Sequence, residues 1–172
     1  GKGLSGGTIA LSGVATTTAH MEAVRRSAGN FAHGGTFSHN CVGCVAGLAA
    51  VRILEREDLV TRSRELGERI GRRLREALSG SPHVGDIRGL GMMWGVEIVR
   101  DRNTLQPFPR KQKVAEALWQ NLFDRGVITY KSVGMAGTDG DGLIVAPPFV
   151  ITAEEIDLVV EQLRQAIAQV LG

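Results

Sequence analysis

The chain has 172 residues, of which 43% are hydrophobic, and its 20 basic and 18 acidic side chains give a formal net charge of +2. This length suffices for one ordinary core or two small lobes, and the nearly balanced charge gives no reason to expect a nucleic-acid partner. No stretch approaches the roughly 20 apolar residues that a membrane span requires. The first residues lack the basic start and apolar core of a secretory signal, so we expect a cytoplasmic protein that binds no membrane.

The first seven residues, GKGLSGG, place the amine of Lys2 among glycines. A lysine with such small neighbours can be approached closely by a planar aldehyde, and free backbone N–H groups beside it suit an anionic phosphate. Taken alone, however, a glycine cluster is more typical of a flexible turn with a solvated lysine. Other segments must therefore decide between these two interpretations.

Residues 8–15 are short, apolar and compatible with β structure, so they are predicted to form a strand. A helix is expected around residues 20–26, and Gly29 and Asn30 should end it. The next segment, to Asn40, is predicted to be a loop. Residues 40–54 are rich in small and apolar side chains and are predicted to form a helix.

Cys41 and Cys44 form a Cys-x-x-Cys motif, with His33 and His39 just upstream. A structural zinc site would need a second, separated pair of ligands, which the chain does not offer. In a helix of small apolar residues, cysteines commonly behave as small buried hydrophobic side chains. The pattern therefore favours packing over a metal site or redox chemistry, and we expect no metal.

Another helix is predicted to begin near Glu57 and Asp58 and to end at the turn formed by residues 79–82. Apolar residues recur every four positions along it, while arginines and glutamates are interleaved elsewhere on its surface. The recurring apolar residues are Leu66, Ile70, Leu74 and Leu78. The interleaved charges indicate a solvated face, because a nucleic-acid surface would show basic residues without acidic ones.

Two strands are predicted next, over residues 84–88 and 92–99, with Gly89 and Gly91 in the turn between them. Arg88 is compatible with two roles. It could contact an anion near an active site, or it could pair with a carboxylate such as Glu97.

The remaining segments predict a helix, two strands and a terminal helix. Val114, Leu118 and Leu122 line one face of the first helix, whose end is expected at Gly126. Strands are predicted over residues 127–130 and 143–146.

Residues 134–142, between these two strands, are rich in glycine and acidic side chains and are predicted to be irregular. Thr152 and Glu155 form a capping box for the last helix. The order of helices and strands after residue 58 describes a small α/β sandwich with helices against a sheet.

Five motifs, spread in order along the chain, resemble the class III aminotransferases, which are fold-type I pyridoxal phosphate-dependent enzymes. They are KGLSGG (residues 2–7), FAHGGTFS (31–38), LAAVRILERE (48–57), RGLGMMWGVE (88–97) and APPFVITAEEI (146–156). The resemblance implies an α/β fold, namely the C-terminal part of a fold-type I transferase. In this interpretation residues 1–58 are a remnant of the large cofactor domain, and residues 59–172 form the small C-terminal domain.

The resemblance also implies roles for individual residues. Lys2 would form the Schiff base with pyridoxal 5'-phosphate and move a proton between substrate and cofactor. Thr36 would hydrogen-bond the cofactor phosphate of the neighbouring subunit, which requires a homodimer of the full-length enzyme. The reaction implied is transfer of an amino group from an amine or amino acid donor to a keto acid.

One feature departs from the pattern of many relatives, which carry an arginine for the substrate carboxylate just before Ala146. Here no arginine occurs between residues 127 and 162. The choice of amino donor therefore stays open. Two alternatives also stay open: an aminomutase or decarboxylase of the same fold, and a catalytically silent fragment without the cofactor contacts that relatives supply from their N-terminal half.

Overall fold

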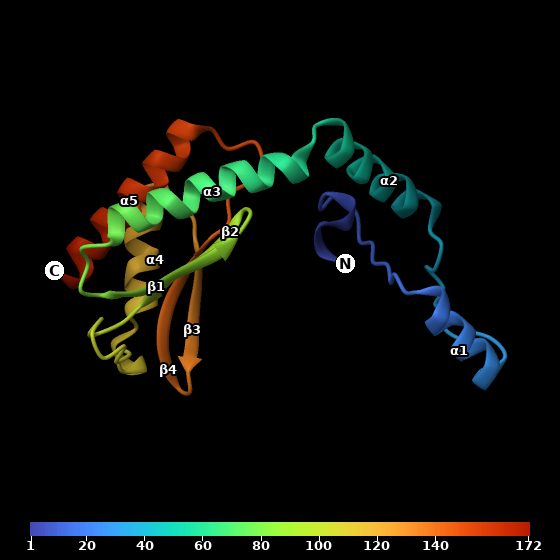
Figure 1. The fold of residues 1–172 in the computed structure, drawn as a ribbon, viewed down its shortest axis with the longest axis horizontal. Helices are drawn as coiled ribbons and strands as arrows, with labels where there is room; N and C mark the ends of the chain where they lie inside the picture. Colours follow the sequence, from blue (N-terminus) through green and yellow to red (C-terminus); the bar gives the residue numbers. More distant parts are fainter. The chain divides into compact units, whose positions relative to one another are not determined.

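A computed structural model describes all residues 1–172 and divides them into two compact units. Unit 1 comprises Gly1–Leu59 and unit 2 comprises Val60–Gly172 (Figure 1). No helix in either unit is both long enough and apolar enough to cross a membrane.

Unit 1 contains a short 3-10 helix, η1 (Lys2–Ser5), and two α-helices, α1 (Thr18–Ala28) and α2 (Cys41–Arg56). The strand predicted over residues 8–15 is wrong, because this segment runs as irregular chain. Strand backbone groups need a neighbouring strand to receive their hydrogen bonds, and all the strands of the structure pair within unit 2.

Side-chain caps explain where the two α-helices of unit 1 begin. The Thr17 hydroxyl accepts the backbone N–H of His20 at 3.4 Å and caps α1. The Asn40 carboxamide oxygen accepts the N–H groups of Val42 and Gly43 at 3.0 and 3.3 Å and caps α2. Such caps satisfy N–H groups that have no partner within the helix. Both predicted helices are thus confirmed, and α2 ends two residues later than expected.

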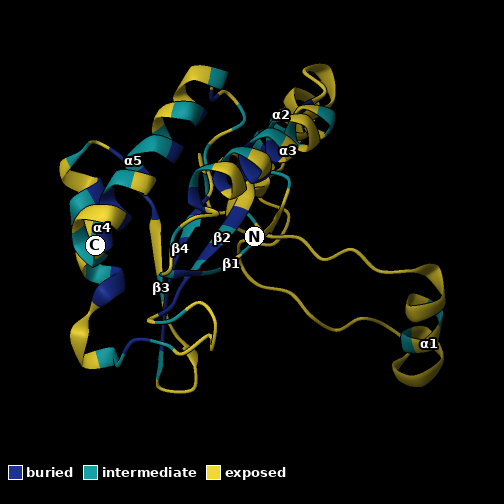
Figure 2. Cartoon of the chain, turned by 60° about the vertical axis from the view of Figure 1, so that its left-hand side comes forward, coloured by how far each residue is buried: buried dark blue, intermediate teal, exposed yellow.

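Unit 1 buries little of its apolar surface (Figure 2). In η1 and α2 only Ser5, Gly43 and Gly47 are buried, and α1 has no buried residue. On α2, Val42 and Val45 are each 67% exposed.

Unit 2 is one antiparallel four-stranded sheet covered by helices. Its elements are α3 (Leu59–Leu78, which starts at the last residue of unit 1), β1 (Val84–Leu90), β2 (Met93–Ile98), η2 (Arg110–Gln112), α4 (Val114–Asp124), β3 (Tyr130–Ala136), β4 (Asp139–Val145) and α5 (Ala153–Leu171). The strand order is β1-β2-β4-β3. The predicted small α/β sandwich is therefore confirmed.

The buried cluster of unit 2 joins the three α-helices to one face of the sheet. Of the side chains predicted for the α3 stripe, Ile70, Leu74 and Leu78 are at most 1% exposed. Trp94 and Val96 face them from β2 and are 5% and 1% exposed. Alternation along β2 places every second side chain in this core.

Two glycines of α3 allow the β1–β2 hairpin to approach the helix closely. A side chain at Gly67 would clash with the backbone carbonyl of Gly91, and one at Gly71 would clash with the Trp94 ring. The Trp94 indole N–H donates to the Gly91 carbonyl at 2.9 Å. The turn at Gly91 has a φ of 54°, which glycine adopts without strain.

The structure corrects the predicted role of Gly89 and the predicted strands after residue 126. Gly89 lies within β1 opposite Trp94 rather than in the turn. β3 begins at Tyr130, and residues 134–142 are mostly strand, forming a hairpin around Gly137. Gly137, in the turn, has a φ of 69°, and Gly140, near the start of β4, has a φ of 96°, both conformations that glycine adopts without strain. The glycine content was misread as irregular structure.

The terminal helix has the predicted capping box. The Thr152 hydroxyl accepts the N–H of Glu155 at 3.2 Å, and the Glu155 carboxylate accepts the N–H of Thr152 at 2.8 Å. Arg69 and Arg73 of α3 hold α5 by donating to Asp157 at 2.9 and 2.8 Å. The hydrogen bond from Arg73 is the main cause that lowers the pKa of Asp157.

Candidate functional site

Lys2 lies on a tight, exposed turn of unit 1. Its φ is 57°, a left-handed conformation that costs an L-residue of this kind about 1–2 kcal/mol. Side chains added at Gly3, Gly6 or Gly7 would meet nothing within 4 Å. Lys2 therefore lies on a turn whose neighbouring glycines leave open space around it.

Ser5 anchors this turn to the rest of unit 1. It is only 2% exposed, and its hydroxyl donates to the carbonyl of Ile9 at 2.5 Å. The Ser5 carbonyl in turn accepts the Thr8 hydroxyl at 2.8 Å. These bonds close the chain into a compact loop directly after Lys2.

The glycines of α2 provide the surface against which this loop packs. A side chain at Gly47 would come within 2.6 Å of the Leu11 side chain, and one at Gly43 within 3.4 Å. The carbonyl of Leu4 also lies 3.7 Å from the added atom at Gly47. Two glycines one turn apart thus form a shallow groove for the segment that follows Lys2.

Thr36 lies in the loop that leads into α2, and its side chain is exposed. The loop is closed by two hydrogen bonds between Gly35 and Ser38. The Gly35 N–H donates to the Ser38 hydroxyl at 2.8 Å, and the Ser38 N–H donates to the Gly35 carbonyl at 2.9 Å. Thr36 takes no part in either bond, so its hydroxyl is free to bind a ligand.

Lys2 and Thr36 both belong to unit 1. The segment after Lys2 packs on α2 through Leu11, and the loop that carries Thr36 leads into α2 at the Asn40 cap. No hydrogen bond links their side chains. An exposed lysine on a glycine-flanked turn suits an aldehyde such as that of pyridoxal phosphate, and an exposed hydroxyl suits a phosphate.

A carboxylate for the pyridine nitrogen of the cofactor is not found beside Lys2. The buried acid of the chain is Asp141 in unit 2, which is 0% exposed. Its carboxylate accepts the N–H of Ala115 at 3.0 Å, near the start of α4, and Arg110 lies 3.6 Å away. Burial raises the pKa of Asp141. We therefore assign it a structural role in capping α4. This role was not predicted, because Asp141 lies in the glycine-rich segment that was expected to be irregular.

Of the two roles considered for Arg88, an anion contact and a pair with a carboxylate, the structure shows the pair. Its guanidinium donates to Asp86 of the same strand at 2.7 Å and, across the β1–β2 hairpin, to Glu97 at 2.9 Å. The hydrogen bond to Asp86 is the main cause that raises the pKa of Arg88 and lowers that of Asp86.

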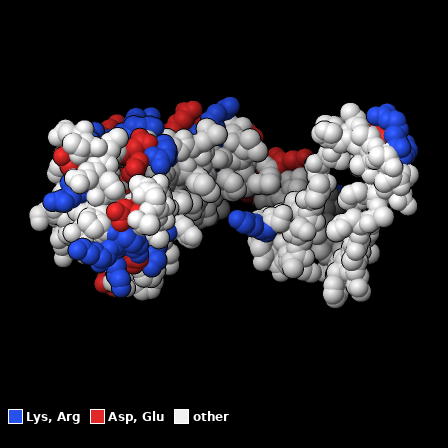
Figure 3. Space-filling view, turned by 90° about the horizontal axis from the view of Figure 1, so that it is seen from below, with Lys and Arg blue, Asp and Glu red and all other residues white.

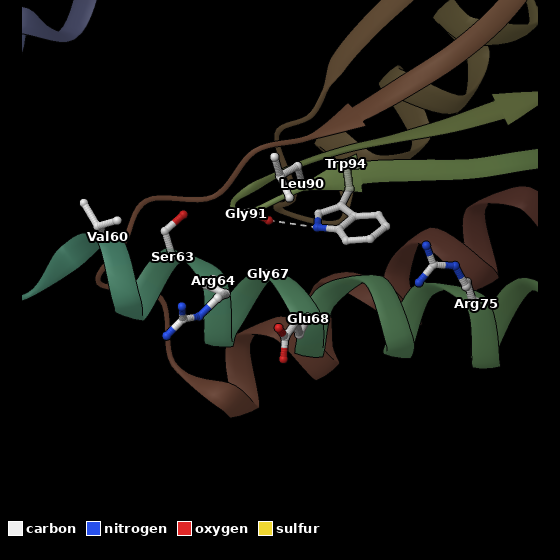
Figure 4. A pocket seen from close by; sticks show the side chains of 10 residues that line it. Val60, Ser63, Arg64, Gly67, Glu68, Arg75, Leu90, Gly91 and Trp94 are labelled. Carbon is white, nitrogen blue, oxygen red and sulfur yellow. Dashed lines mark hydrogen bonds between the residues drawn. The ribbon is translucent and has the colours of Figure 1, made fainter.

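Unit 2 contains a pocket of about 490 Å³ between α3 and the β1–β2 hairpin (Figure 4). Ser63, Arg64 and Glu68 line it from α3, while Leu90 and Trp94 line it from the hairpin. Neither predicted site residue contributes to it. Acidic and basic side chains lie beside one another over unit 2, whereas much of unit 1 is uncharged (Figure 3).

The chain matches the family described as "Aminotransferase class-III" over residues 1–167. An uncharacterised aminotransferase of Schizosaccharomyces pombe is 38% identical over 138 residues, covering 80% of this chain and 30% of the relative. An aminotransferase of Gibberella zeae is 32% identical over 173 residues, covering 99% of this chain and 34% of the relative. The chain thus spans about a third of the length of these curated relatives.

A solved structure with a similar fold is a thermostable (S)-enantioselective omega-transaminase from Thermomicrobium roseum. It superposes with a TM-score of 0.85 at 31% identity, covering 99% of this chain and 36% of the transaminase. The fold is therefore that of the C-terminal third of fold-type I transaminases. Because the family match covers nearly the whole sequence in order, the chain belongs to the class III aminotransferases, a family that uses pyridoxal phosphate.

Proposed function

We propose that this chain supplies the cofactor lysine, Lys2, of a pyridoxal phosphate-dependent aminotransferase. The full-length enzyme would transfer an amino group from an amine or amino acid donor to a keto acid. The observation that carries the proposal is the geometry at Lys2, whose amine projects from a glycine-flanked turn anchored by the buried Ser5. Family membership supplies the chemistry that such an amine would serve.

Pyridoxal phosphate, when bound, supplies the electron sink that weakens a bond to the substrate carbon. Lys2 has two tasks in this proposal. Its amine would hold the cofactor at the aldehyde carbon and would also move a proton at the substrate carbon. The open glycines around it leave room for the flat ring to approach.

We propose that Thr36 contacts the cofactor phosphate of a second subunit, which makes the full-length enzyme a homodimer. The exposed Thr36 hydroxyl in a closed, hydrogen-bonded loop supports this role. Lys2 and Thr36 of one chain then serve different sites, so they need not lie against each other. In this proposal residues 1–58 belong to the large cofactor domain and residues 59–172 to the small domain.

The test of the lysine is selective labelling. The purified chain is incubated with pyridoxal phosphate, reduced with borohydride and mapped by peptide mass spectrometry. We expect the adduct on Lys2 to exceed those on Lys111, Lys113 and Lys131. A Lys2→Arg variant keeps the positive charge and should lose this adduct, while Lys131→Arg should not. Equal labelling of all four lysines would contradict the proposal.

The test of the threonine uses the full-length enzyme. Thr36→Ala removes the hydroxyl and should weaken cofactor binding by at least about tenfold, since a hydrogen bond to a charged group contributes about 1.5–3 kcal/mol. Thr36→Ser keeps the hydroxyl and should bind the cofactor nearly as the wild type does. Unchanged affinity in Thr36→Ala would reject the phosphate contact and, with it, this argument for a dimer.

A further inference from the structure

Ser5 is the only buried polar side chain of unit 1, and it lies three residues after Lys2. Lys2 and Ser5 are the first and last residues of η1, and bonds between residues three apart close a 3-10 helix. The 2% exposure of Ser5 is produced by these residues alone, so it does not depend on segments that only longer relatives contain. A buried hydroxyl is therefore fixed to the same turn that carries the lysine.

The Ser5 hydroxyl closes the loop that follows this turn. It donates to the Ile9 carbonyl at 2.5 Å, and the Ile9 N–H approaches the same hydroxyl oxygen at 3.4 Å. A hydroxyl has one donor and two acceptor sites, so it can serve both groups. No other group of the protein donates to the Ile9 carbonyl. Closure of the loop at Ile9 therefore depends on one side chain.

The closed loop brings the chain back beside Lys2. An atom added at Gly1 would lie 3.8 Å from the Cβ atom of Ser12, and one added at Gly13 would lie 3.6 Å from the Leu4 side chain. Residues 12 and 13 thus run past the residues on either side of Lys2. The turn that carries the lysine is supported by the segment that the Ser5 hydroxyl folds back.

We propose that Ser5 is a positioning residue for Lys2, whose hydroxyl aims the lysine amine by closing the loop at Ile9. Lys2 has a left-handed φ of 57°, a conformation that a residue with a side chain keeps only when its surroundings hold it. The Ser5–Ile9 bond and the returning segment supply this restraint. The inference rests on the proposed role of Lys2 as the cofactor lysine.

The step that depends on aim is the formation of the bond to Lys2. The lysine Nζ gains a bond to the aldehyde carbon, while the aldehyde oxygen and two amine hydrogens leave as one water molecule. A misplacement of about 1 Å in reacting groups can cost about 100-fold in rate. Ser5 does not touch the reacting atoms, so its hydroxyl should affect the rate of this step and not the binding of the cofactor ring and phosphate.

Two probes separate these effects in the full-length enzyme freed of cofactor. Pyridoxal phosphate can bond to Lys2, whereas pyridoxine 5'-phosphate carries an alcohol in place of the aldehyde and can only bind. Stopped-flow absorbance measures the rate of bond formation with pyridoxal phosphate, and borohydride reduction with peptide mapping identifies the lysine. Titration calorimetry measures the affinity for pyridoxine 5'-phosphate.

The decisive variant is Ser5→Ala, which removes the hydroxyl. It should form the bond to Lys2 at least about tenfold more slowly than the wild type, with unchanged affinity for pyridoxine 5'-phosphate. Ser5→Thr keeps the hydroxyl and should react nearly as fast as the wild type.

Thr8→Val is a matched control in the same loop. It removes an exposed hydroxyl that donates to the Ser5 carbonyl at 2.8 Å, but the Thr8 N–H still donates to that carbonyl at 3.3 Å. Because the Ser5 hydroxyl and its bond to Ile9 remain, the rate should change by no more than about twofold.

An unchanged rate in Ser5→Ala, or a rate in Ser5→Thr as low as in Ser5→Ala, would overturn the positioning role. Loss of folded enzyme in Ser5→Ala, or a parallel loss of affinity for pyridoxine 5'-phosphate, would also overturn it, because Ser5 would then be purely structural. Failure of the proposed function has a different signature, namely a wild-type adduct on a lysine other than Lys2 in the peptide map.

Discussion

Units 1 and 2 differ in how much hydrophobic surface they bury. Every member of the buried hydrophobic cluster lies in unit 2, whereas unit 1 holds its loops with a few specific contacts, notably Ser5 and the Leu11–Gly47 groove. The two predicted site residues, Lys2 and Thr36, lie in unit 1. If the proposed function holds, stability and chemistry are carried by different parts of the chain, a division that is common where function requires mobile or accessible groups.

The largest effect is expected when an apolar side chain is truncated to alanine in the core of unit 2, compared with the same change in unit 1. Leu74 is 0% exposed, so Leu74→Ala should lower the free energy of unfolding by about 2–5 kcal/mol. The matched change in unit 1, Leu48→Ala at a residue 49% exposed, should cost no more than about 0.5 kcal/mol. Denaturant unfolding followed by far-UV circular dichroism suits this test, because both units contain α-helices, whereas the only tryptophans, Trp94 and Trp119, lie in unit 2 and report on that unit alone. Equal losses of unfolding free energy in the two variants would show that the two units are packed equally well.

A second comparison uses helix glycines in the two units. Gly67→Ala should destabilise unit 2 by about 1–3 kcal/mol, because the new methyl group meets the backbone of Gly91, which cannot step aside. Gly47→Ala in unit 1 meets the flexible end of Leu11, and the gain in helix propensity offsets the crowding. Far-UV circular dichroism during denaturation measures both. A stable Gly67→Ala variant would show that the hairpin is not tightly packed on α3.

A third test concerns Asp141, the buried acid of unit 2. Asp141→Ala leaves the Ala115 N–H without its acceptor and should cost about 1–3 kcal/mol. Asp141→Asn keeps an acceptor oxygen and should cost less.

The two variants also differ from the wild type in their pH dependence. Burial raises the folded pKa of Asp141 above its ordinary value near 3.8, so the folded state binds this proton more tightly than the unfolded state does. The stability of the wild type relative to Asp141→Asn should therefore fall as the pH rises from about 3.8 through the raised pKa and stay constant above it. Stability curves measured across this range check the sign, and a relative stability that rises would contradict the buried location.

The smallest effects are expected at surface ion pairs in both units. Arg88→Ala removes the pairs with Asp86 and Glu97 but affects a side chain that is 61% exposed, so it should cost at most about 1 kcal/mol. Arg25→Ala in unit 1, which loses one pair with Glu22, should cost about 0.3–0.5 kcal/mol. Added salt should reduce the difference in stability cost between the two variants. A loss of stability above about 1 kcal/mol in Arg88→Ala would indicate a role beyond this pairing.

The sequence predicted most of unit 2 because its signals are local and consistent. The four-residue spacing of Ile70, Leu74 and Leu78 and the capping box at Thr152 each describe a helix without any distant partner. The glycine-rich hairpin was missed, because the positive φ values of Gly137 and Gly140 place them in a turn and a strand that only the paired backbone reveals.

In unit 1 the same approach failed for residues 8–15, since a short apolar segment forms a strand only where a partner strand is present. The motifs around Lys2 and Thr36 identified the family, but neither the left-handed conformation of Lys2 nor the anchoring by Ser5 follows from a residue pattern. The exposure of Cys41 and Cys44 was also missed, because the burial of α2 depends on which of its small residues faces Leu11.

The strand order of unit 2 has a consequence for the kinetics of folding. The β1–β2 and β3–β4 pairs are local hairpins, whereas the central pairing places Trp94 beside Val145, far along the sequence. Hairpins form in about 1–10 μs, while pairing across a long intervening loop pays the entropy of closing it first. The chain between β2 and β4 contains α4, so early formation of that helix shortens the loop to be closed. Helix α4 would then set the rate at which unit 2 folds, although it contributes no strand to the sheet.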